Sequence, residues 1–191
     1  MPAVNPAGPP PIITSSQLSI RLPSTPPIIV NPFIYLSPFL FVGVSGMDVQ
    51  KRFEFLEHMA DAYIAAYGRN LAEAFENAAY AMFEVMTDVG RVEPKLEEII
   101  EVEGHDECSL LYNWLESLLV RFETEGILYS RFEVLGIESL DGSLRLRARV
   151  AGEHFNPDKH VQKVGVKAVT YHMMEVERKP DGVTLRFLLD L

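Results

Sequence analysis

The stretch EFLEHMADAYIAAYGRNLAEAFENAAYAMFEVM, residues 54–86, decides the fold class because it changes from a strand period to a helix period. Segments 51–58 and 61–68 read as two short strands joined by a tight turn. Asn70 then offers an N-cap with Glu73 three residues on, close to a capping box. Apolar residues follow at helical spacing and predict an amphipathic helix of about 17 residues, whose Met and Phe stripe we assign to the core. These residues are Leu71, Ala74, Phe75, Ala78, Ala79, Met82, Phe83 and Met86.

The segments that follow repeat the strand and helix signals. Apolar and polar residues alternate weakly in residues 95–104, which predicts a strand with one solvent-exposed face. Asp106 can cap a second helix, and Gly126 can end it. The predicted buried face of this helix comprises Leu110, Leu111, Trp114, Leu115, Leu118, Leu119 and Phe122.

Two hairpins complete the chain. Residues 127–140 and 143–153 flank an Asp-Gly turn, and residues 166–179 and 183–191 flank a Pro-Asp-Gly turn, with a polar loop between the hairpins. The element order β-β-α-β-α-β-β-β-β predicts an α+β fold, with helices on one side of a largely antiparallel sheet. One such domain occupies residues 47–191.

Residues 1–46 differ from the rest of the chain. They are rich in Pro and Ser, and their apolar run is broken by Pro32 and Pro38, whereas a membrane helix needs about 20 uninterrupted apolar residues. A signal peptide is an alternative, but its basic region would be Arg21 alone, far from Met1. We expect a disordered leader, or a mis-assigned start with Met47 as the first residue, and no membrane association.

Composition narrows the function classes. The single cysteine, Cys108, excludes an internal disulfide, suits a reducing cytoplasm, and is interpreted as a packing residue. The net charge is −10, and because Arg21 is the one charge of the leader, residues 47–191 carry −11. Such a domain repels phosphates, so we expect no direct nucleic-acid binding; cations and basic protein surfaces are the natural partners.

Standard catalytic motifs are missing from the sequence. It has no dinucleotide or P-loop glycine motif, no nucleophile elbow, no HExxH and no CxxC. His154 and His160 bracket the polar loop, but nearby Lys159 and Lys163 argue against a cation, and we interpret both histidines as surface residues. The acidic run between residues 97 and 107 predicts a solvated face.

Two other acids stand in apolar surroundings. Asp61 precedes a strand between two alanines, and Asp190 precedes Leu191, whose α-carboxylate is at the chain end. Together they would make an oxygen-rich site for calcium, magnesium or manganese. Spacing alone does not bring residue 61 to residue 190, and burial statistics favour two unconnected surface acids.

Taken together, the segments resemble the archease family, the protein cofactors of the RtcB-type tRNA-splicing RNA ligase. The resemblance covers residues 51–191 and rests on six segments in order: FEFLEHMADAYIAAYG, LAEAFENAAYAMFEVMTD, the Trp114 helix with ETEGILYSRFEV, LRLRARVAGEHFNPDKH, VKAVTYH and the terminal LLDL. It implies an α+β fold in which one strand-helix-strand-strand module is inserted in another.

The resemblance also implies a function without catalysis by the chain itself. Family members promote guanylylation of the ligase histidine and multiple turnover, and the ligase joins RNA ends during tRNA splicing. Their metal site implies that Asp61, Asp190 and Leu191 hold a divalent ion, with calcium favoured. The shared VKAVTYH segment nominates Lys167, Thr170 and His172, with strand packing as the alternative, and His58 is a further candidate.

Two positions depart from the family pattern. Met59 stands where the family usually has Thr, and a thioether cannot donate a hydrogen bond to a carboxylate as a hydroxyl can. Gly165 stands where an acid is common. Two other functions remain open: a metal-independent acidic binding module, and a small phosphoesterase using Asp61 with His58 or His172.

Overall fold

The computed structural model describes residues 51–57 and 61–191, and the predicted leader lies outside them. Two helices and seven strands occur in this part of the chain. In chain order they are β1 Phe53–Leu56, β2 Ala62–Gly68, α1 Leu71–Met86, β3 Leu96–Gly104, α2 Glu107–Glu125, β4 Ile127–Leu140, β5 Ser143–His154, β6 Ala168–Lys179 and β7 Gly182–Asp190, with a 3₁₀ turn at Val89–Arg91 after α1.

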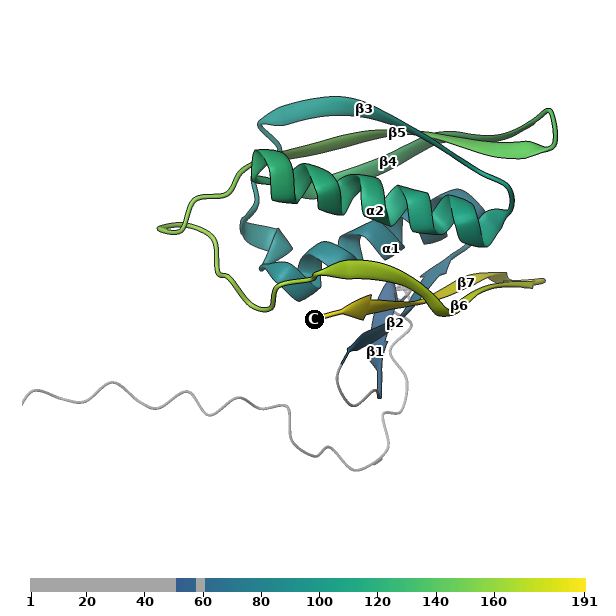
Figure 1. The fold of residues 1–191 in the computed structure, drawn as a ribbon, viewed down its shortest axis with the longest axis horizontal. Helices are drawn as coiled ribbons and strands as arrows, with labels where there is room; N and C mark the ends of the chain where they lie inside the picture. Colours follow the sequence, from purple (N-terminus) through teal and green to yellow (C-terminus); the bar gives the residue numbers. More distant parts are fainter. Residues whose placement is uncertain (1–50, 58–60) are drawn as a thin grey trace, which may run out of the picture. The chain divides into compact units, whose positions relative to one another are not determined.

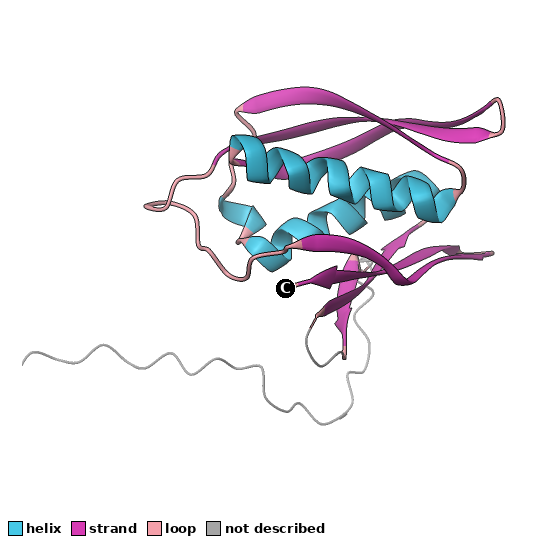
Figure 2. Cartoon of the chain, in the orientation of Figure 1, coloured by secondary structure: helices cyan, strands magenta, loops and turns pink. Residues whose placement is uncertain are grey.

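The strands form two antiparallel sheets instead of one. Sheet A has the order β1-β2-β7-β6, and sheet B has the order β3-β5-β4. Both helices lie between the sheets, so each sheet is covered on one face only (Figures 1 and 2). The predicted α+β class and strand order are confirmed, and the single sheet becomes two because residues 96–154 pair only among themselves.

The chain order explains this division. The β3-α2-β4-β5 segment builds sheet B and interrupts a β1-β2-α1-β6-β7 unit that builds sheet A. This is the inserted strand-helix-strand-strand module that the resemblance implied. Helix α1 contacts β2 of one sheet and β4 of the other, and α2 contacts β3 and β6.

The helix ends follow the sequence signals. The Asn70 side chain accepts from the Glu73 N–H at 3.0 Å. Asp106 forms a capping box with Ser109. Gly126 ends α2 in the left-handed region with φ 67°, which glycine adopts without a steric penalty. Both predicted helices are therefore confirmed within a residue or two.

One continuous core joins the layers. The Trp114 indole is fully buried and donates from Nε1 to the Phe75 carbonyl at 3.1 Å, which connects α2 to α1. The Phe83 ring meets the Tyr129 ring of β4 edge-on, with centroids 5.6 Å apart. Neither helix in the described residues is long and apolar enough to cross a membrane.

The outward face of sheet B carries Glu97, Glu101 and Glu103 of the acidic run, whereas Glu98 bonds to Tyr129 and to Arg121 of α2. Arg145, Arg147 and Arg149 of β5 each pair with a glutamate of β3, at 2.7, 3.1 and 3.2 Å. The predicted solvated face of β3 is confirmed, and its charges are neutralised by a central column of arginines.

Candidate functional site

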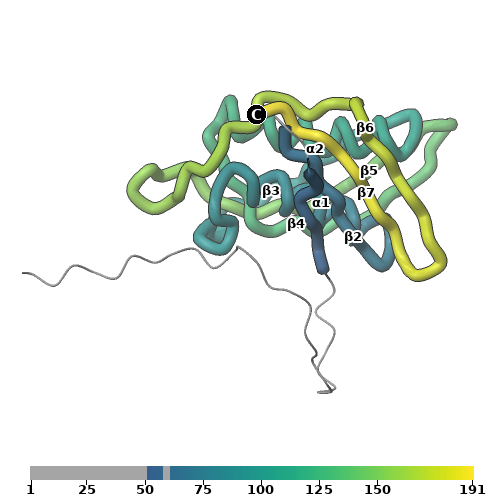
Figure 3. Tube along the Cα trace, turned by 90° about the horizontal axis from the view of Figure 1, so that it is seen from below, coloured from purple at the N-terminus to yellow at the C-terminus, as the bar shows by residue number. Residues whose placement is uncertain are grey.

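Sheet register brings the start of β2 beside the end of the chain. Ala62 is paired with Leu189 across the β2–β7 ladder. Asp61 immediately precedes β2 and Asp190 is the last residue of β7, so the two acids lie at the same end of the β2–β7 ladder. Figure 3 shows the chain end at this edge of sheet A. The structure thus supplies the proximity that sequence spacing did not.

Lys167 joins the same edge from the third strand. Its backbone N–H donates to the Asp190 carbonyl at 2.8 Å, and its Nζ donates to the terminal backbone oxygen of Leu191. Ala168 then pairs with Asp190 in the β6–β7 ladder. Strands β2, β7 and β6 therefore contribute Asp61, Asp190 with Leu191, and Lys167 to one place.

Thr170 and His172 lie further along β6. Thr170 is paired with Leu188, which places it on the same face as Asp190, two residues or about 7 Å away. The His172 N–H donates to the Thr170 hydroxyl at 2.9 Å, and His172 is exposed in a bulge. His58 and Met59 lie outside the described residues. Lys167 thus contacts Asp190 and Leu191, and Asp61 lies at the same end of sheet A, whereas Thr170 and His172 lie further along β6.

The oxygen atoms of these residues are suited to a hard cation, to which the protein would supply only some of the ligands. Two side-chain carboxylates and one terminal carboxylate are oxygen ligands of the kind calcium and magnesium prefer, with water completing the shell. Within the described residues no three His, Cys, Asp or Glu side chains are grouped to hold a metal, so the terminal carboxylate would be the third ligand. Lys167 already contacts the terminus, and it would hold that carboxylate in place.

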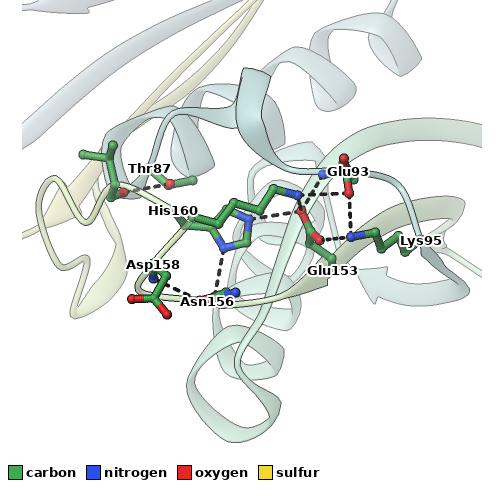
Figure 4. Close-up of polar contacts among 9 residues, drawn as sticks. Thr87, Glu93, Lys95, Glu153, Asn156, Asp158 and His160 are labelled. Carbon is green, nitrogen blue, oxygen red and sulfur yellow. Dashed lines mark hydrogen bonds and ion pairs between the residues drawn. The ribbon is translucent and has the colours of Figure 1, made fainter.

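A second polar cluster, the Glu153 cluster, lies at the opposite end of the loop that leads to Lys167 (Figure 4). Glu153 is 7% exposed and accepts from the Glu93 N–H at 2.8 Å and from Lys95 Nζ at 2.8 Å. Lys159 Nζ also donates to it, and His160 Nε2 lies 3.1 Å from its Oε1. Glu153 is therefore a buried carboxylate that receives four donors.

The contacts within the cluster determine which ring nitrogen of His160 carries the hydrogen and lower the pKa of Glu153. His160 Nδ1 accepts from the Asn156 N–H at 2.9 Å, so Nε2 carries the hydrogen that is donated to Glu153. Burial favours a raised pKa for Glu153, but the Glu93 N–H, Lys159, Lys95 and His160 together hold this pKa well below its usual range. Glu153 is thus an anchoring carboxylate and not a proton donor near neutral pH.

Further contacts fix the loop between Glu153 and Lys167. The Thr87 hydroxyl donates to the Val161 carbonyl at 2.8 Å, and the Lys163 N–H donates to the Met86 carbonyl at 2.9 Å. Lys163 Nζ also pairs with Glu84 at 2.6 Å. The middle of the loop, at Val161 and Lys163, is therefore attached to the C-terminal end of α1.

The sequence interpretation of His160 was wrong. His160 is 4% exposed and belongs to the Glu153 cluster, whereas His154 is exposed as expected. Loop polarity suggested a solvated histidine, because Glu153 becomes its partner only when β5 and the loop meet in three dimensions. The sequence did offer one signal for this cluster. Glu153 is a charged residue that directly follows the buried residues Val150–Gly152 of β5.

Of the two departures from the family pattern, Gly165 lies in the described residues and Met59 does not. A Cβ atom added at Gly165 would meet nothing within 4 Å, so no close approach requires glycine there. Cys108 is partly buried at the start of α2, and burial raises the pKa of its thiol, which agrees with a packing role.

The fold defines a small α+β protein in which one strand-helix-strand-strand module interrupts another. The chain belongs to the Archease protein family, whose model matches residues 53–191. It is 49% identical over 141 residues to protein archease of Sulfurisphaera tokodaii, covering 74% of this chain and 99% of that protein. It is 48% identical over 132 residues to protein archease of Pyrococcus furiosus, covering 69% of this chain and 92% of that protein.

A solved relative has the same architecture. The solution structure of Methanobacterium thermoautotrophicum protein 1598 matches with a TM-score of 0.66 at 46% identity, covering 73% of this chain and 99% of that chain. The fold and the family membership inferred from the sequence are therefore confirmed.

Proposed function

We propose that this chain is a non-catalytic activator of an RtcB-type tRNA-splicing ligase, which promotes guanylylation of the ligase histidine and so sustains multiple turnover. Membership of the Archease family supports the class of function. The observation that carries the proposal for this chain is the convergence of Asp61, Asp190, Leu191 and Lys167 at one edge of sheet A. The proposed setting is the cytoplasm.

The chain's own groups would bind and orient a divalent ion, with calcium favoured and magnesium or manganese as alternatives. Asp61 and Asp190 would supply side-chain oxygens, and Lys167 would hold the Leu191 carboxylate as the third ligand. The ion, when bound, would neutralise phosphate charge. Because the site is formed by strand ends at the surface, a partner protein could reach it.

A guanylylation assay tests the proposal. The ligase is incubated with radiolabelled GTP under conditions in which it is slowly modified, with and without the full chain. We expect faster transfer of label to the ligase with the chain, and slower transfer with an Asp61→Asn/Asp190→Asn double variant. Equal labelling with and without a folded chain would contradict the proposal.

The metal-independent binding module remains the second candidate, supported by the acidic charge of the domain. It predicts that calcium leaves the unfolding temperature unchanged, since a ligand that binds only the folded state must raise it. The phosphoesterase alternative predicts turnover of model phosphoesters without ligase.

A further inference from the structure

Strand β6 leaves the regular ladder immediately after the candidate site. Thr170 is paired with Leu188 and Glu175 with Arg186, so residues 171–174 stand opposite Phe187 alone. Met173 has φ 57°, a left-handed conformation that a side chain with a Cβ atom rarely adopts. The Thr170 hydroxyl closes the turn by accepting from the His172 N–H at 2.9 Å. A bulge of this kind re-aims side chains and persists where the surroundings determine it.

The bulge displays two large side chains to solvent. Tyr171 is 53% exposed and Met173 is 45% exposed. The Tyr171 ring is stacked on Tyr112 of α2, with centroids 4.3 Å apart and the planes inclined by 13°. Met174 packs against the core and holds the bulge from below. Tyr171 is therefore presented in a fixed orientation, which lowers the entropy lost when it is buried by a partner.

Acidic groups border these side chains. The pKa of Tyr171 is raised, chiefly by burial and to a smaller extent by the nearby Tyr112, Asp106 and Cys108. Asp106, Glu107 and Glu175 act on Cys108 at the base of the bulge. Glu107 is paired with Arg178 and Glu175 with Arg186. With three carboxylates and two guanidinium groups, the border has an excess of negative charge.

We propose that Tyr171 and Met173 form a docking knob for a protein partner whose surface has an apolar pocket bordered by lysine or arginine. Tyrosine and methionine are enriched at protein interfaces, and an exposed, pre-oriented tyrosine is a typical anchor. The occupant is a protein and not RNA, because the acidic border repels the phosphates that dominate nucleic-acid affinity.

The knob lies close to the candidate site. Tyr171 is three residues along β6 from Ala168, which is paired with Asp190, a separation of about 10 Å. Tyr171 faces α2, whereas Asp190 lies on the other face of sheet A, so a protein seated on the knob would have to extend around the edge strand β6 to contact Asp190. The inference rests on the proposed function in one respect, because the ligase is the partner used to test it.

The test compares ligase binding by the full chain and its variants, using isothermal titration calorimetry with the cognate ligase. We expect Tyr171→Ala and Met173→Gly to bind at least about tenfold more weakly, as anchor residues do. Leu140→Ala is the matched control, since Leu140 is also 45% exposed but lies at the β4–β5 turn, and it should bind as the unmodified chain does.

Met173→Gly adds a readout that a purely structural role would not give. Relief of the positive φ offsets the entropy that glycine adds to the unfolded chain, so this variant should unfold at nearly the same urea concentration as the unmodified chain while it binds the ligase more weakly. Unchanged ligase binding by a folded Met173→Gly variant would contradict a docking role for this side chain.

The outcomes separate the inference from the proposed function. If the unmodified chain binds and activates the ligase and both variants bind equally well, the docking knob is overturned and the proposed function stands. If labelled single-stranded RNA binds the chain and Tyr171→Ala abolishes only that binding, the surface belongs to nucleic acid and the inference is overturned. If the unmodified chain neither binds nor activates the ligase, both are overturned.

Discussion

Replacing Glu153 by glutamine should destabilise the protein by about 2 kcal/mol at pH 7. The Oε1 atom receives the Glu93 N–H, Lys159 and His160, and the Oε2 atom receives Lys95 at 2.8 Å. A glutamine oxygen at the Oε1 position keeps three of these contacts, but its amide nitrogen then faces the Lys95 ammonium. One charge-assisted hydrogen bond is lost, which is typically about 1.5–3 kcal/mol.

The exposure of the lysines limits this loss. The Lys95 side chain is 60% exposed and also lies 2.5 Å from Glu93, so its charge is not stranded when Glu153 is neutralised. Glu153→Ala removes every acceptor and leaves the Glu93 N–H and the buried His160 ring without this partner. The alanine variant should therefore lose more stability than the glutamine variant, about 3 kcal/mol, because a buried donor is left unsatisfied.

The effect of Glu153→Gln should also depend on pH with a definite sign. Because the native pKa of Glu153 lies below its unfolded value, the stability it contributes is fully present above about pH 4.3 and is lost as the pH falls toward the native pKa. The difference between the unmodified protein and Glu153→Gln should therefore be constant from pH 8 to pH 5 and decrease below pH 4.

Urea unfolding followed by circular dichroism at pH 7, 5 and 3.5 measures these differences. Glu97→Gln is a suitable control, because Glu97 forms an exposed pair with Arg149 at 3.2 Å and should change stability by less than about 1 kcal/mol. A Glu153→Gln loss below about 0.5 kcal/mol, or a loss that does not change down to pH 3.5, would refute the reasoning.

Three further outcomes follow from the structure. Trp114→Phe should lose about 2–4 kcal/mol in urea unfolding, because it removes buried volume and the hydrogen bond from Nε1 to the Phe75 carbonyl; a loss under about 1 kcal/mol would argue against this hydrogen bond. Gly152→Ala should prevent soluble folding at 37 °C, because the new Cβ would lie 1.8 Å from the Leu128 carbonyl oxygen, whereas Gly165→Ala should fold normally; equal yields would contradict this. Calcium at 100 times its dissociation constant should add about 2.7 kcal/mol of stability to the unmodified chain and none to Asp61→Asn/Asp190→Asn, as read from thermal unfolding with EDTA as the reference; equal shifts in both proteins would place the ion elsewhere.

Local signals in the sequence were sufficient for the helices and hairpins. Asn70, Asp106 and Gly126 set the helix ends because capping is decided within a few residues. The division into two sheets was not predictable, because alternation shows that one face of a strand is buried but does not say which strand pairs with it. The pairing of β2 with β7, which are more than a hundred residues apart, is a long-range choice of this kind.

The same limit applies to the candidate site. Asp61 and Asp190 were recognised as unusual from their apolar neighbours, but their proximity came from the family resemblance and then from the β2–β7 register. The bulge in β6 was missed because VTYHMMEV has the composition of an uninterrupted strand. The Glu153 cluster was missed because the partners of Glu153 come from two distant segments, the residues before β3 and the loop after β5.

The proposed activation of the ligase depends most directly on Asp61 and Asp190 at the edge of sheet A. The measurement that tests it is multiple-turnover RNA ligation by the cognate ligase, with the unmodified chain, with Asp61→Asn/Asp190→Asn, and with Glu101→Gln/Glu103→Gln as a control of equal charge change on the outward face of sheet B. We expect sustained turnover with the unmodified chain and the control, and a fall toward the level of ligase alone with the aspartate variant. Full activity of a folded aspartate variant would contradict the central claim.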